Sequence, residues 1–322
     1  MKVGLDVAPL AQTAAGTARL VRGLLGALEA RPELELQPLT FGGPGRLATV
    51  ARDAAWYPAG IAWQARDLDI LHCTTMRVPL RARPPVVATV HDMALLRMPE
   101  AFPEWHRRTG RMALRHAARR ADAIVTVSAF TRDELVELLG VPTDRVRVVR
   151  NGVEPVFSPD GPRAGGDYVL AVGTLEPRKN LGRIVEAAQA AGVELRVVGA
   201  PGWGGVAVPG WVGRVDDDEL AALYRGARCL VFPSLYEGFG IPIVEAMACG
   251  TPVVTSRGGA TEEVAGGAAV LVDPLDVDAI VAGILEAGSR RDALIALGLE
   301  RARGFTWERA ASDLVELWRE LL

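Results

Sequence analysis

Lysine and asparagine are nearly absent from this sequence. Of its 36 lysines and arginines only Lys2 and Lys179 are lysines, and the 322 residues include just two asparagines, Asn151 and Asn180. A chain that uses arginine for almost every positive charge therefore places a lysine between Arg178 and an asparagine. This exception raises the question of what an ammonium group does there that a guanidinium would not.

Cysteine is scarce as well, and long apolar runs are missing. Cys73, Cys229 and Cys249 show no CxxC or metal-ligand spacing, and an odd, sparse set argues against a disulfide framework. The N-terminus lacks the basic segment and apolar block of a signal peptide, and no run of about 18 apolar residues is long enough to span a membrane. We therefore expect a protein of the reducing cytoplasm.

The charges are unevenly distributed along the chain. Residues 1–160 carry 21 Lys and Arg against 17 Asp and Glu, a net charge of +4, whereas residues 161–322 carry 15 against 22, a net charge of −7. The length exceeds what one core usually holds, so two domains with different partners are expected. A total charge of −3, without a basic motif interleaved with aromatics, argues against nucleic acid as a partner.

Short apolar segments alternate with amphipathic segments from one end to the other. Strands are expected at residues 2–7, 69–72, 86–92, 123–128, 145–149, 168–173, 194–199, 229–234, 252–256 and 269–273. Helices are expected at residues 17–30, 104–120, 131–139, 179–191, 216–226, 242–249, 276–287 and 305–321. Near-continuous apolar strands separated by helices are typical of parallel sheets covered on both faces. A Pro, Gly and Ser cluster at residues 158–167 divides the alternation, so the predicted fold class is α/β with two Rossmann-like units.

The exceptional lysine follows the expected strand 168–173 directly. Ligands of such folds bind at the carboxyl ends of the strands. Arg178 offers a planar fork and Lys179 a movable point charge, a pair suited to two adjacent phosphates. The alternative is a surface Arg-Lys pair in a turn, but the place at a strand end favours the phosphate hypothesis.

A second motif occupies residues 234–254. Glu237 lies on the loop after the expected strand 229–234, and Glu245 follows eight residues later. Two carboxylates facing one pocket would accept hydrogen bonds from the vicinal hydroxyls of a sugar or ribose. The alternative makes Glu245 an acid that stabilises the helix dipole and Glu237 a turn residue.

The residues around these two acids fit a ligand-binding helix start. The Gly-Phe-Gly sequence at 238–240 can bring bare backbone N–H groups close to a ligand. Pro242 suits the first helical position and Gly250 the C-terminal cap, which places Glu245 in the first turn. Unpaired N–H groups at a helix start attract anions.

In combination these residues resemble the retaining glycosyltransferases of family 4, which have the GT-B fold. The resemblance covers nearly the whole chain, in blocks at residues 90–103, 121–135, 151–159, 172–181, 234–254 and 258–276. It implies two Rossmann-like domains with parallel sheets facing a central cleft. An acceptor-binding domain would comprise residues 1–160 and a returning helix, residues 306–322, and residues 165–304 would bind the nucleotide-sugar donor.

The resemblance also implies roles for single residues. Lys179 would bind the donor's diphosphate, with Arg178 as the second cation because the family often has Arg where Thr174 stands. Glu245 would hold the ribose hydroxyls, and Glu237 the donor sugar. The implied catalytic residues are His91, Arg178, Lys179 and Glu237. The implied donor-binding residues are Gly16, Gly173, Thr174, Arg178, Lys179, Glu237, Gly238, Phe239, Gly240, Ile241 and Glu245.

The implied chemistry uses no metal and no cofactor besides the nucleotide sugar. The acceptor hydroxyl would attack from the leaving group's face, with a phosphate oxygen as base. The blocks look closest to mannosyltransferases that build cell-surface polysaccharides, so GDP-mannose is the expected donor and a sugar, lipid-linked or small-molecule compound the acceptor. The D-x-D sequence at residues 216–218 is expected to cap a helix rather than to bind a metal.

Several alternatives stay open at this point. A GT-B nucleotide-sugar epimerase would need further catalytic carboxylates and His, and a catalytically silent nucleotide-sugar-binding protein would be expected to lack Glu237 or Lys179. Asp92 either orients His91 or simply ends a strand. Trp203 and Trp211 are more typical of loop packing than of stacking on a base.

One helix carries a further candidate surface. Spacing of four residues predicts a cationic stripe on helix 104–120, formed by Arg107, Arg111, Arg115 and Arg119. Such a stripe is either a solvated face or a peripheral contact with the anionic inner face of a membrane. A dinucleotide-binding oxidoreductase is disfavoured, because no G-x-G-x-x-G follows an expected strand.

Overall fold

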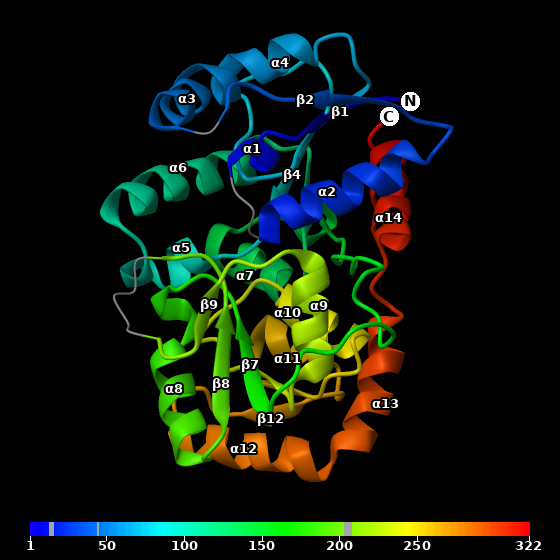
Figure 1. The fold of residues 1–322 in the computed structure, drawn as a ribbon. Helices are drawn as coiled ribbons and strands as arrows, with labels where there is room; N and C mark the ends of the chain where they lie inside the picture. Colours follow the sequence, from blue (N-terminus) through cyan, green and yellow to red (C-terminus); the bar gives the residue numbers. More distant parts are fainter. Residues whose placement is uncertain (13–15, 44, 203–207) are drawn as a thin grey trace. The chain divides into compact units, whose positions relative to one another are not determined.

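The computed structural model describes residues 1–12, 16–43, 45–202 and 208–322, so Trp203 and part of the first loop lie outside the described residues. The chain divides into two compact units (Figure 1). The first comprises Met1–Gly152 and Trp307–Leu322, and the second Val153–Thr306. Each unit contains one six-stranded sheet in which all described neighbouring strands run parallel.

The first unit has the strand order β2-β1-β3-β4-β5-β6. These strands are β1 (Lys2–Asp6), β2 (Glu35–Leu39), β3 (Ile70–Cys73), β4 (Val86–Val90), β5 (Ala123–Thr126) and β6 (Val146–Val148). Its α-helices are α1 (Pro9–Gln12), α2 (Gly16–Glu29), α3 (Arg46–Ala51), α4 (Ile61–Gln64), α5 (Ala94–Arg97), α6 (Glu104–Arg120), α7 (Ala129–Leu139) and α14 (Trp307–Glu320). A π-helical segment (Arg52–Gly60) joins α3 to α4, and short 3-10 turns lie at Pro99–Ala101 and Thr143–Arg145. The strands β3, β4 and β5 are buried along their whole length, as their near-continuous apolar sequences predict.

The C-terminal helix α14 packs on α2 of the first unit, which confirms the predicted return of the chain (Figure 1). Gly23 of α2 makes this approach possible, because a Cβ at that position would lie 2.1 Å from Cε2 of Trp307. Trp318 is fully buried and meets the ring of His72 edge-on, with ring centroids 5.6 Å apart. Large aromatic side chains therefore anchor α14 on the first unit.

The second unit has the strand order β12-β11-β10-β7-β8-β9. These strands are β7 (Tyr168–Val172), β8 (Glu194–Val198), β9 (Trp211–Gly213), β10 (Leu230–Phe232), β11 (Val253–Ser256) and β12 (Val270–Val272). Its α-helices are α8 (Leu181–Ala190), α9 (Asp217–Gly226), α10 (Ile241–Ala248), α11 (Gly259–Ala265), α12 (Val277–Ser289) and α13 (Arg291–Ala302). A 3-10 turn at Pro177–Lys179 precedes α8.

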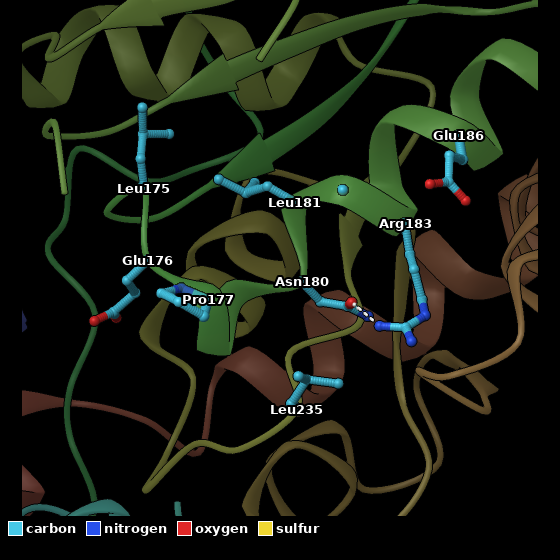
Figure 2. Close-up of a pocket in the computed structure, with 9 residues that line it drawn as sticks. Leu175, Glu176, Pro177, Asn180, Leu181, Arg183, Glu186 and Leu235 are labelled. Carbon is cyan, nitrogen blue, oxygen red and sulfur yellow. Dashed lines mark hydrogen bonds between the residues drawn. The ribbon is translucent and has the colours of Figure 1, made fainter. Parts of the chain in front are cut away.

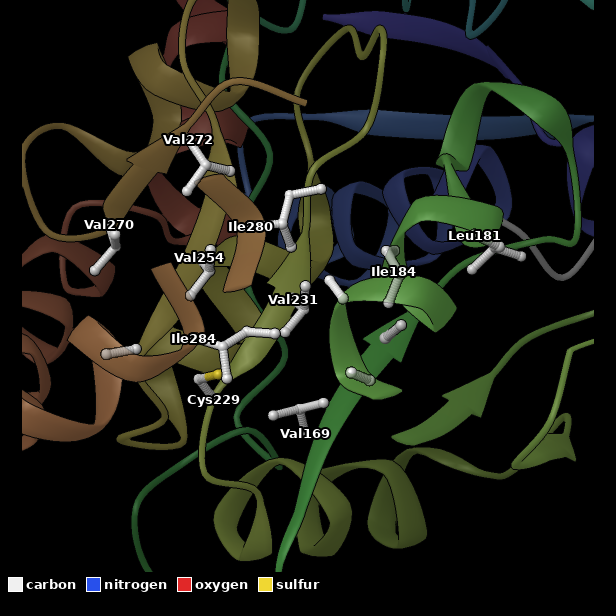
Figure 3. Close-up of a cluster of buried hydrophobic side chains, with 14 of the residues drawn as sticks. Val169, Leu181, Ile184, Cys229, Val231, Val254, Val270, Val272, Ile280 and Ile284 are labelled. Atoms are coloured by element: carbon white, nitrogen blue, oxygen red, sulfur yellow. The ribbon is translucent and has the colours of Figure 1, made fainter. Parts of the chain in front are cut away.

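The core of the second unit lies between the sheet and the helices α8 and α12 (Figure 3). Val169, Val231 and Val254 from neighbouring strands pack with Ile184 and Ile280 from the two helices, and all five side chains are at most 2% exposed. Burial of each such side chain contributes about 1.5–3 kcal/mol to stability. This core fixes the strand ends that carry the candidate site.

Some elements differ from the sequence-based expectation. The helix expected at residues 179–191 begins only at Leu181, because Asn180 adopts a left-handed conformation with φ 60°. The strands β2 and β9 were not predicted: Pro38 interrupts the pattern of β2, and the first two residues of β9 are exposed. In the described residues no helix combines the length and hydropathy needed to cross a membrane.

Candidate active site

The loop after β7 holds its lysine against the backbone. Gly173 has φ 155°, and a Cβ there would lie 3.2 Å from Cδ and Cε of Lys179. The stem of Lys179 therefore runs along the glycine, and its ammonium group lies 5.0 Å from the ring centroid of Phe232 on β10. This packing directs the stem of Lys179 along Gly173 and places the ammonium group beside the aromatic ring.

Asn180 ties this loop to two other strand ends. Its Nδ2 donates hydrogen bonds to the carbonyl oxygens of Pro233, at 3.0 Å, and Pro274, at 2.6 Å. These residues follow β10 and β12. Asparagine tolerates the left-handed conformation better than most residues and supplies two donors, which accounts for one of the two asparagines of the chain.

Glu237 is paired with both cations of the loop. Its Oε1 accepts a hydrogen bond from Nζ of Lys179 at 2.6 Å, and its Oε2 from Nη1 of Arg178 at 2.8 Å. The side chain is 8% exposed. Burial alone would raise the pKa of this carboxyl, but the two cations outweigh burial and hold the pKa at about 2. Burial lowers the pKa of Lys179, and the Glu237 carboxylate opposes that shift.

Arg178 has additional acceptors. Its Nη2 donates to Oε1 of Glu176 at 2.7 Å, and Nη1 also donates to the carbonyl oxygen of Tyr236 at 3.0 Å. In the backbone, the N–H of Leu235 donates to the carbonyl oxygen of Arg178 at 2.9 Å. The sequence did not single out Glu176, because a carboxylate two residues before an arginine carries no pattern of its own.

Glu245 lies further along its helix than predicted. The helix α10 begins at Ile241, so Glu245 is its fifth residue, and the prediction that it falls in the first turn is wrong. The side chain is 2% exposed, and Oε2 accepts a hydrogen bond from the hydroxyl group of Tyr224 at 3.0 Å. Gly240 precedes the helix with φ 97°, a conformation that only glycine adopts readily. Pro242 is the second residue of the helix, one later than predicted, and Gly250 follows the C-cap residue Cys249 with φ 71°.

The remaining donor-site candidates lie close by. Thr174 is half-buried beside Gly173, and its carbonyl oxygen accepts a hydrogen bond from the N–H of Glu176 at 2.8 Å. Phe239 is 4% exposed and meets Phe305 edge-on at 5.7 Å. The carboxyl ends of β7 and β10 thus bring together Gly173, Thr174, Arg178, Lys179, Glu237, Gly238, Phe239, Gly240 and Ile241.

A cavity of about 360 Å³ lies against the same loop (Figure 2). Glu176, Asn180 and Leu235 line it together with Arg183, whose Nη1 donates to Oδ1 of Asn180 at 2.9 Å. The ion-paired Lys179 is not among its lining residues. The cavity therefore lies beside the Lys179–Glu237 pair rather than on it.

His91 and Gly16 belong to the first unit. His91 follows β4, and its Nε2 lies 2.9 Å from the carbonyl oxygen of Thr74. Burial lowers the pKa of His91. The carboxylate of Asp92 accepts a hydrogen bond at 3.0 Å from the N–H of Ala94, the first residue of α5. Gly16 is exposed as the first residue of α2.

Asp6 is a buried acid of the first unit that the sequence did not indicate. Asp6 ends β1 and is fully buried, and its Oδ1 accepts a hydrogen bond from the N–H of Ala8 at 3.0 Å. Burial raises the pKa of Asp6 to about 7, against the opposing effect of that hydrogen bond. The sequence shows only an aspartate at the end of an apolar run, where a surface turn is the ordinary expectation.

The arginines expected to form a stripe on α6 differ in exposure. Arg115 and Arg119 are exposed, whereas Arg107 and Arg111 are half-buried, and Nε of Arg111 donates to the carbonyl oxygen of Leu95 at 3.1 Å. Membrane contact through this helix stays a prediction.

The D-x-D sequence caps a helix. Oδ1 of Asp216 accepts a hydrogen bond from the N–H of Glu219 at 2.8 Å, at the start of α9. Over the described residues, no group of three or more His, Cys, Asp and Glu side chains is placed to hold a metal ion.

Comparison with known proteins decides the family. The family model described as Glycosyl transferases group 1 matches residues 166–289, and the one described as Glycosyltransferase Family 4 matches residues 18–157. The chain is 34% identical over 299 residues to O-antigen chain mannosyltransferase B of Escherichia coli, an alignment that covers 82% of this chain and 78% of that protein. The chain belongs to glycosyltransferase family 4.

Solved structures place this family 4 glycosyltransferase in the GT-B fold. Sucrose-phosphate synthase of Thermosynechococcus elongatus matches with a TM-score of 0.79 at 22% identity, covering 100% of this chain and 99% of that one. The Anabaena protein HepE, in complex with UDP and glucose, matches with a TM-score of 0.76 at 18% identity and covers all of both chains. At these identities the likeness shows the fold alone, and the family relationship shows a glycosyltransferase enzyme.

Proposed function

We propose that this glycosyltransferase moves a sugar from a nucleotide-diphosphate sugar to a hydroxyl group of a saccharide, lipid-linked or small-molecule acceptor, with retention of configuration and without a metal ion. The observation that carries the proposal is the Lys179–Glu237 pair at the carboxyl ends of β7 and β10. It joins a cation suited to a diphosphate with a carboxylate suited to sugar hydroxyls.

The charges of Lys179 and Glu237 are opposite to those that develop on the leaving group and the sugar. Breaking the bond between sugar and diphosphate builds positive charge on the sugar and negative charge on the leaving group. Lys179 and the N–H groups at the start of α10 stabilise the leaving group, and Glu237 binds the sugar beside it. The acceptor hydroxyl attacks on the leaving group's face and passes its proton to a phosphate oxygen, which retains the anomeric configuration.

The second carboxylate argues against a glycosidase-like double displacement. That scheme uses two carboxyl groups about 5 Å apart on either side of the scissile bond, one of them as nucleophile. Here Glu237 is bound by two cations, and Glu245 accepts a hydrogen bond from the hydroxyl group of Tyr224. Glu245 is assigned instead to the ribose hydroxyls of the donor.

GDP-mannose is the proposed donor. Support comes from the name of the Escherichia coli relative, O-antigen chain mannosyltransferase B, which also points to polysaccharide synthesis. A cytoplasmic location stays a prediction. A UDP-sugar is the runner-up, because HepE was solved with UDP and glucose. The donor contacts that the family resemblance implies for His91 and Gly16 stay proposals.

The test is a transfer assay in EDTA with GDP-mannose, UDP-glucose and ADP-glucose, each with and without mannose-containing acceptors. Proton NMR of the product gives the anomeric configuration. The proposal expects release of GDP that depends on an acceptor and a product with the donor's α configuration. Release without acceptor and with change of the sugar's stereocentres would indicate an epimerase, and activity only with added Mn²⁺ would contradict metal independence.

A further inference from the structure

The two adjacent cations of the loop have different surroundings. The guanidinium of Arg178 lies among three acceptors, the carboxylates of Glu176 and Glu237 and the carbonyl oxygen of Tyr236, at 2.7, 2.8 and 3.0 Å. Its side chain is 14% exposed. Arg178 therefore links its own loop to the loop after β10 at several points.

Lys179 has fewer constraints. Its ammonium contacts Oε1 of Glu237, at 2.6 Å, and the face of Phe232. An ammonium is a point charge on a flexible stem, so it can exchange one anionic partner for another without a fixed geometry. Arg178 donates one nitrogen to each of two carboxylates, so turning its planar guanidinium toward a third anion would disturb these contacts.

The ion pairs of the two carboxylates also distinguish Arg178 from Lys179. Glu176 and Glu237 each have side chains that are 8% exposed, so both need a counter-ion. If Arg178 moved to a phosphate, Glu176 would lose its cation and Glu237 one of two. If Lys179 moved, Glu237 would keep Arg178, and only its Oε1 would be released.

From this asymmetry, and on the basis of the proposed function, we propose that Arg178 is a positioning residue and that Lys179 alone exchanges partners. Glu176 holds Arg178, and Arg178 holds Oε2 of Glu237. The donor diphosphate takes Lys179 from Glu237, and the freed Oε1 then accepts a hydrogen bond from a hydroxyl group of the donor sugar. Arg178 therefore does not serve as the second phosphate ligand that the family resemblance implies.

The proposed exchange predicts different requirements for binding the nucleoside diphosphate and for using the complete sugar donor. A nucleoside diphosphate without sugar needs only Lys179, whereas the complete donor also needs the oriented carboxylate. Changes at Arg178 or Glu176 are thus expected to act on turnover and leave diphosphate binding nearly intact.

The experiment compares four variants by calorimetric titration with GDP or UDP, whichever binds the wild type, and by steady-state kinetics with the matching sugar donor. They are Lys179→Ala, Arg178→Lys, Glu176→Gln and the control Arg290→Lys, which alters an exposed ion pair with Glu286. Lys179→Ala should weaken nucleoside diphosphate by about tenfold or more. Arg178→Lys and Glu176→Gln should change that affinity by less than about threefold but lower kcat by about 100-fold.

The pH profile adds a readout that loss of structure alone would not give. The charges of Arg178 and Lys179 lower the pKa of Glu237, so loss of the Arg178 contact raises the pKa of that carboxyl. The acid limb of kcat should therefore move to higher pH in Arg178→Lys. If Arg178→Lys fails to fold, Glu176→Gln, which retains a hydrogen-bond acceptor, carries the comparison of diphosphate affinity with kcat.

Two results would overturn the inference. One is a loss of nucleoside diphosphate affinity in Arg178→Lys as large as in Lys179→Ala, which would make Arg178 a phosphate ligand. The other is unchanged kcat in both positioning variants. If the wild type binds neither GDP nor UDP, the proposed function itself fails, which is a separate outcome.

Discussion

Lys179 and Glu237 are 58 residues apart in the sequence, yet Nζ and Oε1 lie 2.6 Å apart with both side chains largely buried. The pair joins the loops that follow β7 and β10, the strands paired in the middle of the second sheet. Before any donor binds, the lysine is neutralised by the carboxylate that is assigned to the sugar. Under the proposed function, donor binding would therefore compete with this internal ion pair.

Glu237→Gln should separate binding from catalysis. Removal of the carboxylate releases Lys179, so affinity for nucleoside diphosphate should stay equal to the wild type or rise, whereas kcat should fall by about 100-fold. The unbalanced cations should also lower the free energy of unfolding by about 2–3 kcal/mol. Titration calorimetry, kinetics and urea unfolding measure these three quantities. A parallel loss of diphosphate affinity and kcat would contradict the competition.

A substitution at Gly23 tests how the C-terminal helix α14 packs on α2. In Gly23→Ala the added methyl group would lie 2.1 Å from Trp307, and we expect a loss of about 1–3 kcal/mol in the free energy of unfolding. Gly26→Ala on the same helix is the matched control, since among the described residues no heavy atom outside its own stretch of helix lies within 4 Å of the added Cβ, and it should gain up to about 1 kcal/mol. Equal stabilities of the two variants in denaturant would mean that Trp307 does not pack there.

Asp6 should make the wild type less stable as the pH rises. Its pKa rises from 3.8 to about 7 on folding, so its contribution is fully present below pH 3.8 and is lost as the pH rises through 7. Between pH 5 and 7.5 this group alone should cost about 2–3 kcal/mol. The stability of Asp6→Asn relative to the wild type should therefore increase over that interval, measured by urea unfolding at both pH values. A constant difference would show that Asp6 ionises normally.

His72 should make the wild type less stable as the pH falls. Burial lowers its pKa from 6.5 to about 3, so its contribution is present above pH 6.5 and is lost as the pH falls toward 3. Acidification from pH 7.5 to 5 should cost about 2 kcal/mol through this residue. His72→Gln, which retains a partner for the hydroxyl group of Thr89, should lack that loss. Because Asp6 and His72 nearly cancel in the wild type, only the two variants reveal the separate effects.

Asn180 separates backbone geometry from hydrogen bonding. Asn180→Gly keeps the left-handed conformation but loses the three side-chain hydrogen bonds, whereas Asn180→Ala loses these bonds and also disfavours the left-handed conformation. The alanine variant should therefore unfold about 1 kcal/mol more easily than the glycine variant. Each should be less stable than the wild type by about 1–3 kcal/mol. Thermal unfolding of the three proteins decides this order.

The sequence predicted most of the fold because both sheets consist of buried parallel strands with apolar sequences. It also predicted that Lys179 and Glu237 follow strand ends, and their assignment to a donor site stays a proposal. The pairing of Glu237 with both cations could not be predicted, because it depends on how the loops after β7 and β10 meet. The burial of Asp6 is equally invisible, since an aspartate at a strand end usually faces solvent.

The most direct test of the account is a thermal-shift panel of UDP, GDP, ADP and their sugar conjugates in EDTA, on the wild type and Lys179→Ala. At 100 times its dissociation constant a ligand stabilises by about 2.7 kcal/mol, which gives a clear shift. The account predicts that one nucleotide, expected to be GDP, shifts the wild type and not the variant. Equal shifts for both proteins, or shifts that appear only with Mn²⁺, would contradict the role of Lys179 as the diphosphate cation.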